Sequence, residues 1–231
     1  MSGTLPPPDI EEFKRRAAEQ AVKHVRSGMV VGLGTGSTAK FAVEAIGRKL
    51  ENGELSDIVG IPTSIQTRDL ARSVGISLTT LNERPAIDLT IDGADEIDPK
   101  GNLVKGGGGA LLWEKIVATA SRQLFIVADE SKLVTRLGES FPLPVEVIGF
   151  GWSTHEAPLR ELGADPALRL DAAGQPYVTD EGHYLIDCRF PDGIADLETV
   201  HDTIGIRPGV VETGLFLNMS PEVIVGRSKG V

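Results

Sequence analysis

Short apolar segments alternate with amphipathic segments through the first half of the chain, and this alternation restricts the fold more than any other feature of the sequence. The clearest unit is an apolar run at 29–33, which enters a glycine-rich turn at 34–38 and continues into a helical pattern from 39 to about 50. Further strands are predicted at 57–61, 76–78, 87–91 and 124–128, and further helices at 10–27, after Ser64 through Ser73, and at 111–122. This order predicts a mostly parallel sheet covered by helices on both faces.

The pattern changes after about Phe141. A proline-bounded strand at 142–147, a short helix at 154–162, a β-hairpin at 169–189 with its turn at 180–182, a helix at 197–204 and a strand at 210–216 are predicted in that order. A βαββαβ order is typical of a small α+β domain with an antiparallel sheet. A last strand at 222–226 is expected to return to the main sheet.

The composition excludes several classes of partner. The net charge is -10, whereas a nucleic-acid-binding protein usually carries a basic surplus, so we expect no nucleic-acid partner. Cys188 is the only cysteine, which excludes an intramolecular disulfide and fits a reducing cytoplasm. No apolar run is long enough to span a bilayer, and the N-terminus lacks the regions of a secretory signal. We expect no membrane association, and an extended tail at Pro6, Pro7 and Pro8.

The turn at 34–38, with the sequence GTGST, lies where a strand enters a helix. Backbone N–H groups at a helix N-terminus, together with the hydroxyls of Thr35, Ser37 and Thr38, would form an anion-binding loop. The turn is neither a Walker A motif nor a dinucleotide-binding fingerprint, because Ser37 stands where the last glycine of the fingerprint is required. The simpler alternative is a tight turn whose serine or threonine caps the helix.

Four carboxylates follow the predicted strand at 87–91: Asp92, Asp95, Glu96 and Asp98. In a parallel sheet the ligand crevice lies at the carboxyl ends of the strands, so Asp92 and Asp95 are expected to face one pocket. The spacing does not match a Ca²⁺ loop, and no phosphate-linked metal sequence accompanies the cluster to support Mg²⁺. A Mg²⁺ site stays possible, and the third interpretation is a set of hydrogen-bond acceptors for sugar hydroxyls, with one carboxyl able to exchange protons. A solvated acidic turn is the alternative, and it fits Glu96 and Asp98 better.

Lys105 precedes four consecutive glycines at 106–109, and Glu114 follows in the first turns of a predicted helix. Glycines allow a cation and exposed backbone N–H groups to approach a ligand oxygen closely. Glu114 is either a favourable contact of the helix dipole or a carboxylate base aimed at a carbon acid. The dipole would lower its pKa, and burial beside Leu112 or Trp113 would raise it, so both interpretations stay open.

Five motifs taken together in this order, GTGSTA, DGADEID, KGGGGA, ADESK and FPLPVEV, resemble ribose-5-phosphate isomerase of the A type over nearly the whole chain. The resemblance implies interconversion of D-ribose 5-phosphate and D-ribulose 5-phosphate in the pentose phosphate pathway, with no cofactor and no metal. It implies a cytoplasmic homodimer or homotetramer. It also implies a Rossmann-like main domain of residues 1–138 plus 208–231, and a smaller ferredoxin-like α+β domain of residues 139–207.

The same resemblance implies roles for individual residues. Glu114 matches the catalytic base, Asp92 and Asp95 match acids that contact the sugar, and Lys105 matches the lysine of the glycine loop. The residues expected to contact the substrate are Thr35, Gly36, Ser37, Thr38, Gly93, Ala94, Gly106, Gly107, Gly108, Lys132 and Lys14. The chain departs from the family pattern in its fourth glycine, Gly109, and in its proline-rich N-terminus.

Two other functions compete with this prediction. A related sugar-phosphate isomerase or deaminase would share the phosphate-binding turn, but we would not expect it to pair DGADEID with KGGGGA. A sugar-phosphate-sensing domain of a transcription repressor would carry an attached DNA-binding region, which the short acidic N-terminus and the net charge do not favour.

Overall fold

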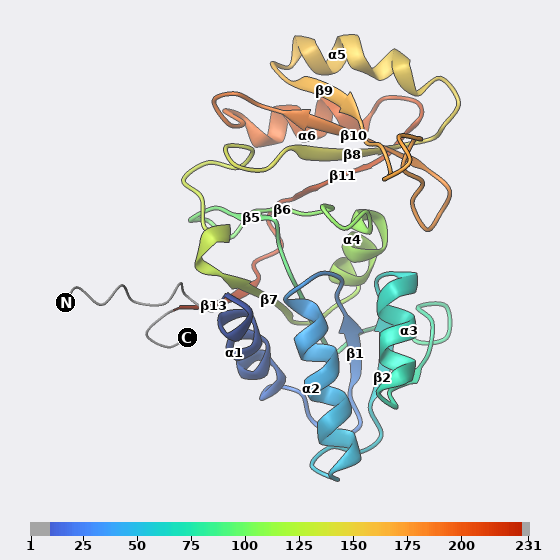
Figure 1. The fold of residues 1–231 in the computed structure, drawn as a ribbon, viewed down its shortest axis with the longest axis vertical. Helices are drawn as coiled ribbons and strands as arrows, with labels where there is room; N and C mark the ends of the chain where they lie inside the picture. The colour runs from blue at the N-terminus through green and yellow to red at the C-terminus, as the bar shows by residue number, and fades with distance from the viewer. Residues whose placement is uncertain (1–9, 228–231) are drawn as a thin grey trace, which may run out of the picture.

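A computed structural model describes residues 10–227, so the predicted proline-rich tail lies outside the described residues. A six-stranded sheet forms the centre of one half of the molecule (Figure 1), in the order β13-β7-β4-β1-β2-β3. Its strands are β1 (Val30–Leu33), β2 (Val59–Pro62), β3 (Ser77–Leu78), β4 (Leu89–Asp92), β7 (Leu124–Asp129) and β13 (Glu222–Gly226). Every neighbouring pair is parallel. The predicted parallel sheet and the return of the last strand to it are confirmed.

The strand order reverses between β1 and β4, because the chain builds outward from β1 to β3 on one side and from β4 to β13 on the other. Such a reversal opens a crevice at the carboxyl ends of the two strands, where α/β proteins bind ligands. The turn at 34–38 follows β1, and Asp92 ends β4. The two predicted parts of the site therefore meet at this crevice.

Helices cover both faces of the parallel sheet, as the amphipathic patterns predict. They are α1 (Ile10–Val22), α2 (Ala39–Glu51), α3 (Ile65–Ser73) and α4 (Leu111–Thr119). The first three share a core with Phe125 and Val127, which point to one face of β7. Ala118 of α4 packs with Leu124 and Ile126, which point to the other face. No helix among residues 10–227 combines the length and the apolar character that crossing a membrane requires.

Two helices end earlier than their patterns predict. The first stops at Val22 instead of Ser27, because the next turn tightens: His24 N–H donates to Ala21 O at 3.0 Å, and Val25 turns into the core. The fourth stops at Thr119 rather than residue 122, because the chain there already joins the sheet, with Arg122 N–H donating to Ile87 O at 2.9 Å.

A four-stranded antiparallel sheet forms the second half of the molecule (Figure 1). Its strands are β8 (Leu143–Val147), β9 (Asp165–Leu168), β10 (Tyr184–Arg189) and β11 (Val210–Thr213), in the order β11-β8-β10-β9. The helices between them are α5 (Glu156–Glu161), preceded by a 3-10 turn η2 (Trp152–His155), and α6 (Leu197–Gly205). Numbered along the chain, the strand order is 4-1-3-2 in a βαββαβ unit, so the predicted ferredoxin-like architecture is confirmed.

The predicted hairpin at 169–189 is wrong in its outgoing strand. The partner of β10 is β9, and residues 169–183 form a long loop, which we call the strap. Asp171, Gly174 and Pro176 interrupt the strand pattern, since the Asp171 carboxylate accepts from the Ala173 and Gln175 N–H groups in a local turn. The turn at 180–182 is correct, with Thr179 N–H donating to His183 O at 2.9 Å.

The single strand predicted at 210–216 is two strands, broken at Gly214. The second, β12 (Leu215–Phe216), leaves the antiparallel sheet and joins β6 (Leu103–Val104) and β5 (Glu96–Ile97) in a third sheet between the other two (Figure 1). Gly214 is needed at the crossing, because an added Cβ would lie 2.3 Å from Lys105 O. Since β11 pairs with β8, we propose that the smaller domain extends beyond the expected boundary at 207, through Thr213.

Candidate active site

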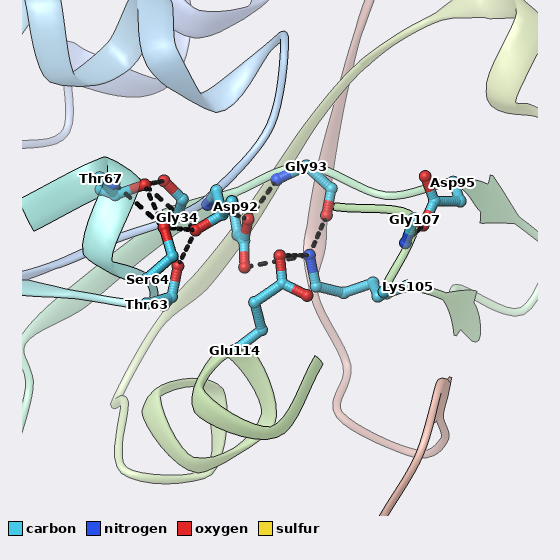
Figure 2. Close-up of polar contacts among 12 residues, drawn as sticks. Gly34, Thr63, Ser64, Thr67, Asp92, Gly93, Asp95, Lys105, Gly107 and Glu114 are labelled. Atoms are coloured by element: carbon cyan, nitrogen blue, oxygen red, sulfur yellow. Dashed lines mark hydrogen bonds and ion pairs between the residues drawn. The ribbon is translucent and has the colours of Figure 1, made fainter. Parts of the chain in front are cut away.

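Three charged side chains meet at the carboxyl end of β4. Lys105 directly follows β6, Asp92 ends β4, and Glu114 lies in the first turn of α4. The Lys105 Nζ lies 3.0 Å from Asp92 Oδ2 and 3.2 Å from Glu114 Oε1, and it donates to Gly93 O at 2.6 Å (Figure 2). None of the three side chains is more than 5% exposed. Sequence reasoning predicted all three residues, and the structure brings them into direct contact.

The lysine stays charged despite its burial. Burial alone would lower the pKa of Lys105, but the neighbouring Asp92 and Glu114 outweigh it and raise the pKa above its ordinary value. A buried ammonium between two carboxyls is therefore a fixed positive charge of this site. It can stabilise a negative charge that develops on a bound ligand.

The two carboxyls that face this lysine differ in their other partners. Asp92 Oδ1 accepts from Thr35 N–H at 3.1 Å and from Gly93 N–H at 2.7 Å, whereas Glu114 Oε2 is buried and has no hydrogen-bond partner among residues 10–227. Burial raises the pKa of Glu114 to about 8, with Lys105 opposing the rise. Burial also raises the pKa of Asp92, but three donors favour its ionised form. We infer that Asp92 holds the negative charge and Glu114 exchanges the proton.

Asp95 lies on the opposite side of Lys105 from Asp92 (Figure 2). Its Oδ2 accepts from Gly107 N–H at 2.7 Å, so this aspartate orients the glycine loop. The fit is tight, because a Cβ on Gly107 would lie 2.6 Å from Asp95 Oδ1. The two predicted aspartates therefore flank the lysine, one bound to the ammonium and the other to the glycine loop. Ala94 lies half-buried between them.

The turn after β1 is held close to Asp92 by Gly34, where an added Cβ would lie 2.3 Å from Asp92 Oδ1. Beyond it, Gly36 and Ser37 are exposed at the N-terminus of α2. Thr38 occupies the N-cap position, but its side chain makes no capping hydrogen bond. The alternative of a simple capped turn is therefore not supported, and this helix N-terminus remains open to an anion.

The Thr35 hydroxyl points into the protein instead of toward the open turn. It lies 2.7 Å from the Thr63 hydroxyl, 2.8 Å from that of Ser64 and 3.1 Å from that of Thr67, in a buried network. Thr67 in turn donates to Gly34 O at 3.0 Å. Figure 2 shows the network beside Asp92. Thr63, Ser64 and Thr67 were not predicted from the sequence, although their position after β2 and in the first turn of α3, at the same edge of the sheet, was a usable signal.

Glu96 and Asp98 do not form a solvated acidic turn. Glu96 is buried, and its Oε1 accepts from Ser140 N–H at 2.6 Å and from Phe141 N–H at 2.7 Å, which ties down the segment that enters the smaller domain. Asp98 is half-buried and closes its own turn by accepting from Asn102 N–H at 2.9 Å. The expectation of solvation is therefore wrong for the buried Glu96, whereas Asp98 closes a turn whose next residues, Pro99 and Lys100, are exposed.

Two predicted lysines stand apart from the charged cluster. Lys132 lies in the 3-10 turn η1 (Glu130–Lys132), which follows β7 at the same edge of the sheet as Asp92. Lys14 lies on α1, with its Nζ 3.4 Å from a Glu11 carboxyl oxygen. Within residues 10–227 no hydrogen bond or ion pair joins either lysine to the cluster, so their contact with a substrate stays a prediction. The same residues contain no group of three or more His, Cys, Asp or Glu side chains arranged to hold a metal ion.

Comparisons with known proteins agree with these motifs. Residues 59–230 match the family model described as ribose 5-phosphate isomerase A, or phosphoriboisomerase A. A ribose-5-phosphate isomerase A of Roseiflexus castenholzii is 50% identical over 223 residues, which cover 96% of this chain and 95% of the relative.

Solved structures are similar over the same length. A D-ribose-5-phosphate isomerase in complex with phospho-erythronic acid has a TM-score of 0.93 and 40% identity, and the match covers 96% of this chain and 97% of that one. The ribose 5-phosphate isomerase of Plasmodium falciparum has a TM-score of 0.92 and 41% identity, with 96% of both chains covered. The family model, the full-length relatives and the shared fold together show that the chain belongs to the ribose 5-phosphate isomerase A family.

Proposed function

We propose that the protein interconverts D-ribose 5-phosphate and D-ribulose 5-phosphate by moving a proton between C1 and C2 through an enediolate. Membership of the family supports the reaction, and the Glu114–Lys105 pair supports this chemistry. The observation that carries the proposal is Glu114 Oε2, a buried carboxyl oxygen that has no hydrogen-bond partner in the described part of the chain and lies beside a buried ammonium. A carboxyl with a pKa of about 8 is suited to take and return a proton near neutral pH.

In this proposal Glu114 removes the C2 proton of the aldose and returns it to C1. Its Oε1 stays beside Lys105, which leaves Oε2 as the oxygen that accepts the proton. The burial that raises the Glu114 pKa also keeps water away from the proton during transfer.

Negative charge that develops on the substrate oxygens is stabilised by Lys105 and by the glycine loop. Gly108 is exposed, and its N–H has no acceptor among residues 10–227, so it is available to donate to an oxyanion. One donor of this kind is worth roughly 3–4 kcal/mol of transition-state stabilisation. The isomerisation also requires the hydroxyl proton on O2 to leave and O1 to gain a proton. Because Asp92 is committed to three donors, we assign this transfer from O2 to O1, and the exchange of hydroxyl protons during ring opening, to Asp95.

The phosphate is assigned to the turn that includes Gly36, Ser37 and Thr38. Exposed backbone N–H groups at the start of a 13-residue helix supply donors and a favourable dipole. Binding energy from this remote group would hold the reacting carbons against Glu114. We add Lys132 and Lys14 as further cations near the phosphate, and propose a homodimer or homotetramer in the cytoplasm, because the family resemblance implies these features.

A direct assay separates this proposal from its alternatives. Purified protein is mixed with D-ribose 5-phosphate, and ketose is measured with and without excess EDTA. We expect ketose to form at the same rate in both, because the proposed steps use only side chains and backbone groups. Release of ammonia from an amino-sugar phosphate would indicate a deaminase, and binding without turnover would indicate a sensing domain. Loss of activity in EDTA that Mg²⁺ restores would make the acidic cluster a metal site.

A further inference from the structure

The strap contacts three segments that carry residues of the site. Trp113 Nε1, next to Glu114 in the chain, donates to Glu181 Oε1 at 2.7 Å. Ile65 N–H, at the start of α3, donates to Asp180 Oδ2 at 2.7 Å. The third contact comes from Arg169, which reaches the glycine loop. The smaller domain thus contacts the glycine loop, the start of α3 and the start of α4, although it supplies none of the predicted catalytic side chains.

Arg169 holds two successive carbonyls of the glycine loop. Its Nη1 donates to Gly106 O at 2.9 Å and to Gly107 O at 3.3 Å. In a trans peptide the carbonyl and the following N–H point in opposite directions within one plane. When Arg169 fixes Gly106 O, it also fixes the peptide plane between Gly106 and Gly107. This plane orients Gly107 N–H, which donates to Asp95. The plane fixed at Gly107 O directs the exposed Gly108 N–H away from the strap.

The arginine is itself rigidly placed. Its Nε donates to Asp187 Oδ2 at 2.9 Å and its Nη2 pairs with Asp187 Oδ1, so two arms of the guanidinium are fixed by β10 and the third is left for the loop. Its backbone N–H also donates to Leu185 O at 2.8 Å. Bidentate pairing of this kind fixes direction as well as position, which a lysine cannot do.

We propose that Arg169 is a positioning residue for the isomerisation, acting through the peptide planes of the glycine loop. Four glycines in a row have little conformational preference of their own, and the hydrogen bond inside the loop, from Gly109 N–H to Gly106 O at 3.0 Å, does not involve the Gly107 and Gly108 N–H groups. Asp95 holds the loop on one side and Arg169 on the other, and the Tyr177 hydroxyl adds a longer bond to Gly108 O at 3.4 Å. The inference rests on the proposed function, since it concerns the donors that would stabilise the enediolate.

The test compares R169M, R169K and D187N with the wild type. We expect R169M to lower kcat by ~10-fold to 100-fold, with KM changed by less than about threefold, because the phosphate-binding turn is untouched. R169K keeps the positive charge but lacks the planar guanidinium that pairs with Asp187 and the loop at the same time. Its kcat should therefore lie between those of R169M and the wild type. D187N should lower kcat less than R169M. R160M is the matched control, since Arg160 pairs with Glu156 on the exposed helix α5, and we expect its kinetics to be unchanged.

A second measurement separates positioning from a purely structural role. 4-Phospho-erythronate carries a carboxylate where the enediolate would be, so its affinity should fall in R169M in parallel with kcat/KM. Lower thermal stability with normal kcat and normal affinity for this acid would overturn the inference. If R169M does not fold, the same comparison is made with R169K and D187N, and unchanged kcat in both overturns it. An inactive wild type would overturn the proposed function instead.

Discussion

Glu114 turns only one of its carboxyl oxygens toward Lys105. Oε1 lies 3.2 Å from the ammonium, and Oε2 is buried without a hydrogen-bond partner among residues 10–227. Desolvating an acceptor without pairing it costs folding free energy, so such an oxygen is expected where its partner is a ligand. Asp92, by contrast, uses both oxygens within the protein. The difference between these two carboxyls separates the proton-transferring group from the one that fixes the lysine.

Glu114→Gln should abolish most of the turnover while leaving substrate binding nearly intact. The amide keeps the shape of the side chain but cannot accept a proton from carbon, so kcat should fall by about 10³-fold or more, with KM changed by less than about threefold. Steady-state kinetics with D-ribose 5-phosphate measures both constants. Glu161→Gln on the exposed end of α5 is the control. Turnover near the wild-type level in E114Q would remove Glu114 as the base.

The raised pKa of Glu114 predicts the pH dependence of activity. The base must be ionised in the free enzyme, so kcat/KM should rise with pH and level off above a pKa of about 8. A profile of kcat/KM between pH 5 and 9.5 measures this limb. A limb centred near the ordinary glutamate value of 4.5 would contradict the burial argument.

The same shift predicts how folding stability changes with pH. The folded protein binds the Glu114 proton more tightly than the unfolded chain does. The stabilising contribution of this proton is complete below pH 4.5, and it is lost as the pH rises from 4.5 to about 8. E114Q lacks this contribution at every pH. The free energy of unfolding of E114Q, measured by urea denaturation, should therefore rise relative to that of the wild type as the pH increases from 5 to 8. A constant difference between the two proteins would show that Glu114 does not titrate in this range.

The fold is predictable from the sequence where the signal is local. The apolar runs and glycine-rich turns identify the parallel strands, and the position of Asp92 at the end of β4 follows from one such run. Errors occur where distant segments decide the outcome. Gly214 breaks a strand because Lys105 O lies against it, and residues 169–178 leave the sheet because β9 takes the place beside β10. Neither contact has a spacing that a sequence pattern could reveal.

The candidate site divides in the same way. Asp92, Lys105 and Glu114 belong to motifs and are found from the sequence, although their mutual contacts are not. The burial of Glu96 depends on backbone N–H groups more than 40 residues further along the chain, at Ser140 and Phe141. Arg169 was missed because nothing in its local sequence indicates that it reaches the glycine loop.

Replacing Lys105 by methionine should damage both stability and activity. Removing the ammonium leaves Asp92 and Glu114 buried side by side without a cation, and breaking a buried pair in this way costs ~3–5 kcal/mol. Both carboxyl pKa values should rise further, because Lys105 opposes both shifts. Urea denaturation at pH 6 and pH 8 tests this, and the loss should be larger at pH 8. A variant as stable as wild type at pH 8 would contradict the assignment of Lys105 as the fixed charge of the cluster.

Thr35→Val should weaken substrate binding more than turnover. The substitution keeps the shape of the side chain but removes the hydroxyl that joins Thr63, Ser64 and Thr67. Each of these three retains another partner, because Thr63 donates to Leu33 O, Ser64 bonds Thr67, and Thr67 donates to Gly34 O. The loss of stability should therefore be modest, about 1–2 kcal/mol.

The consequence for function follows from what this network supports. It fixes the turn after β1 against α3, and the next residues, Gly36 to Thr38, are those assigned to the phosphate. A loosened turn should raise KM by roughly tenfold, with a smaller change in kcat, since Glu114 and Lys105 lie outside the network. Thr35→Ser retains the hydroxyl and is the matched control, which should stay close to wild type in both constants. A kcat effect larger than the KM effect in T35V would show that the network acts through Asp92, to which Thr35 N–H also donates, and not through the phosphate-binding turn.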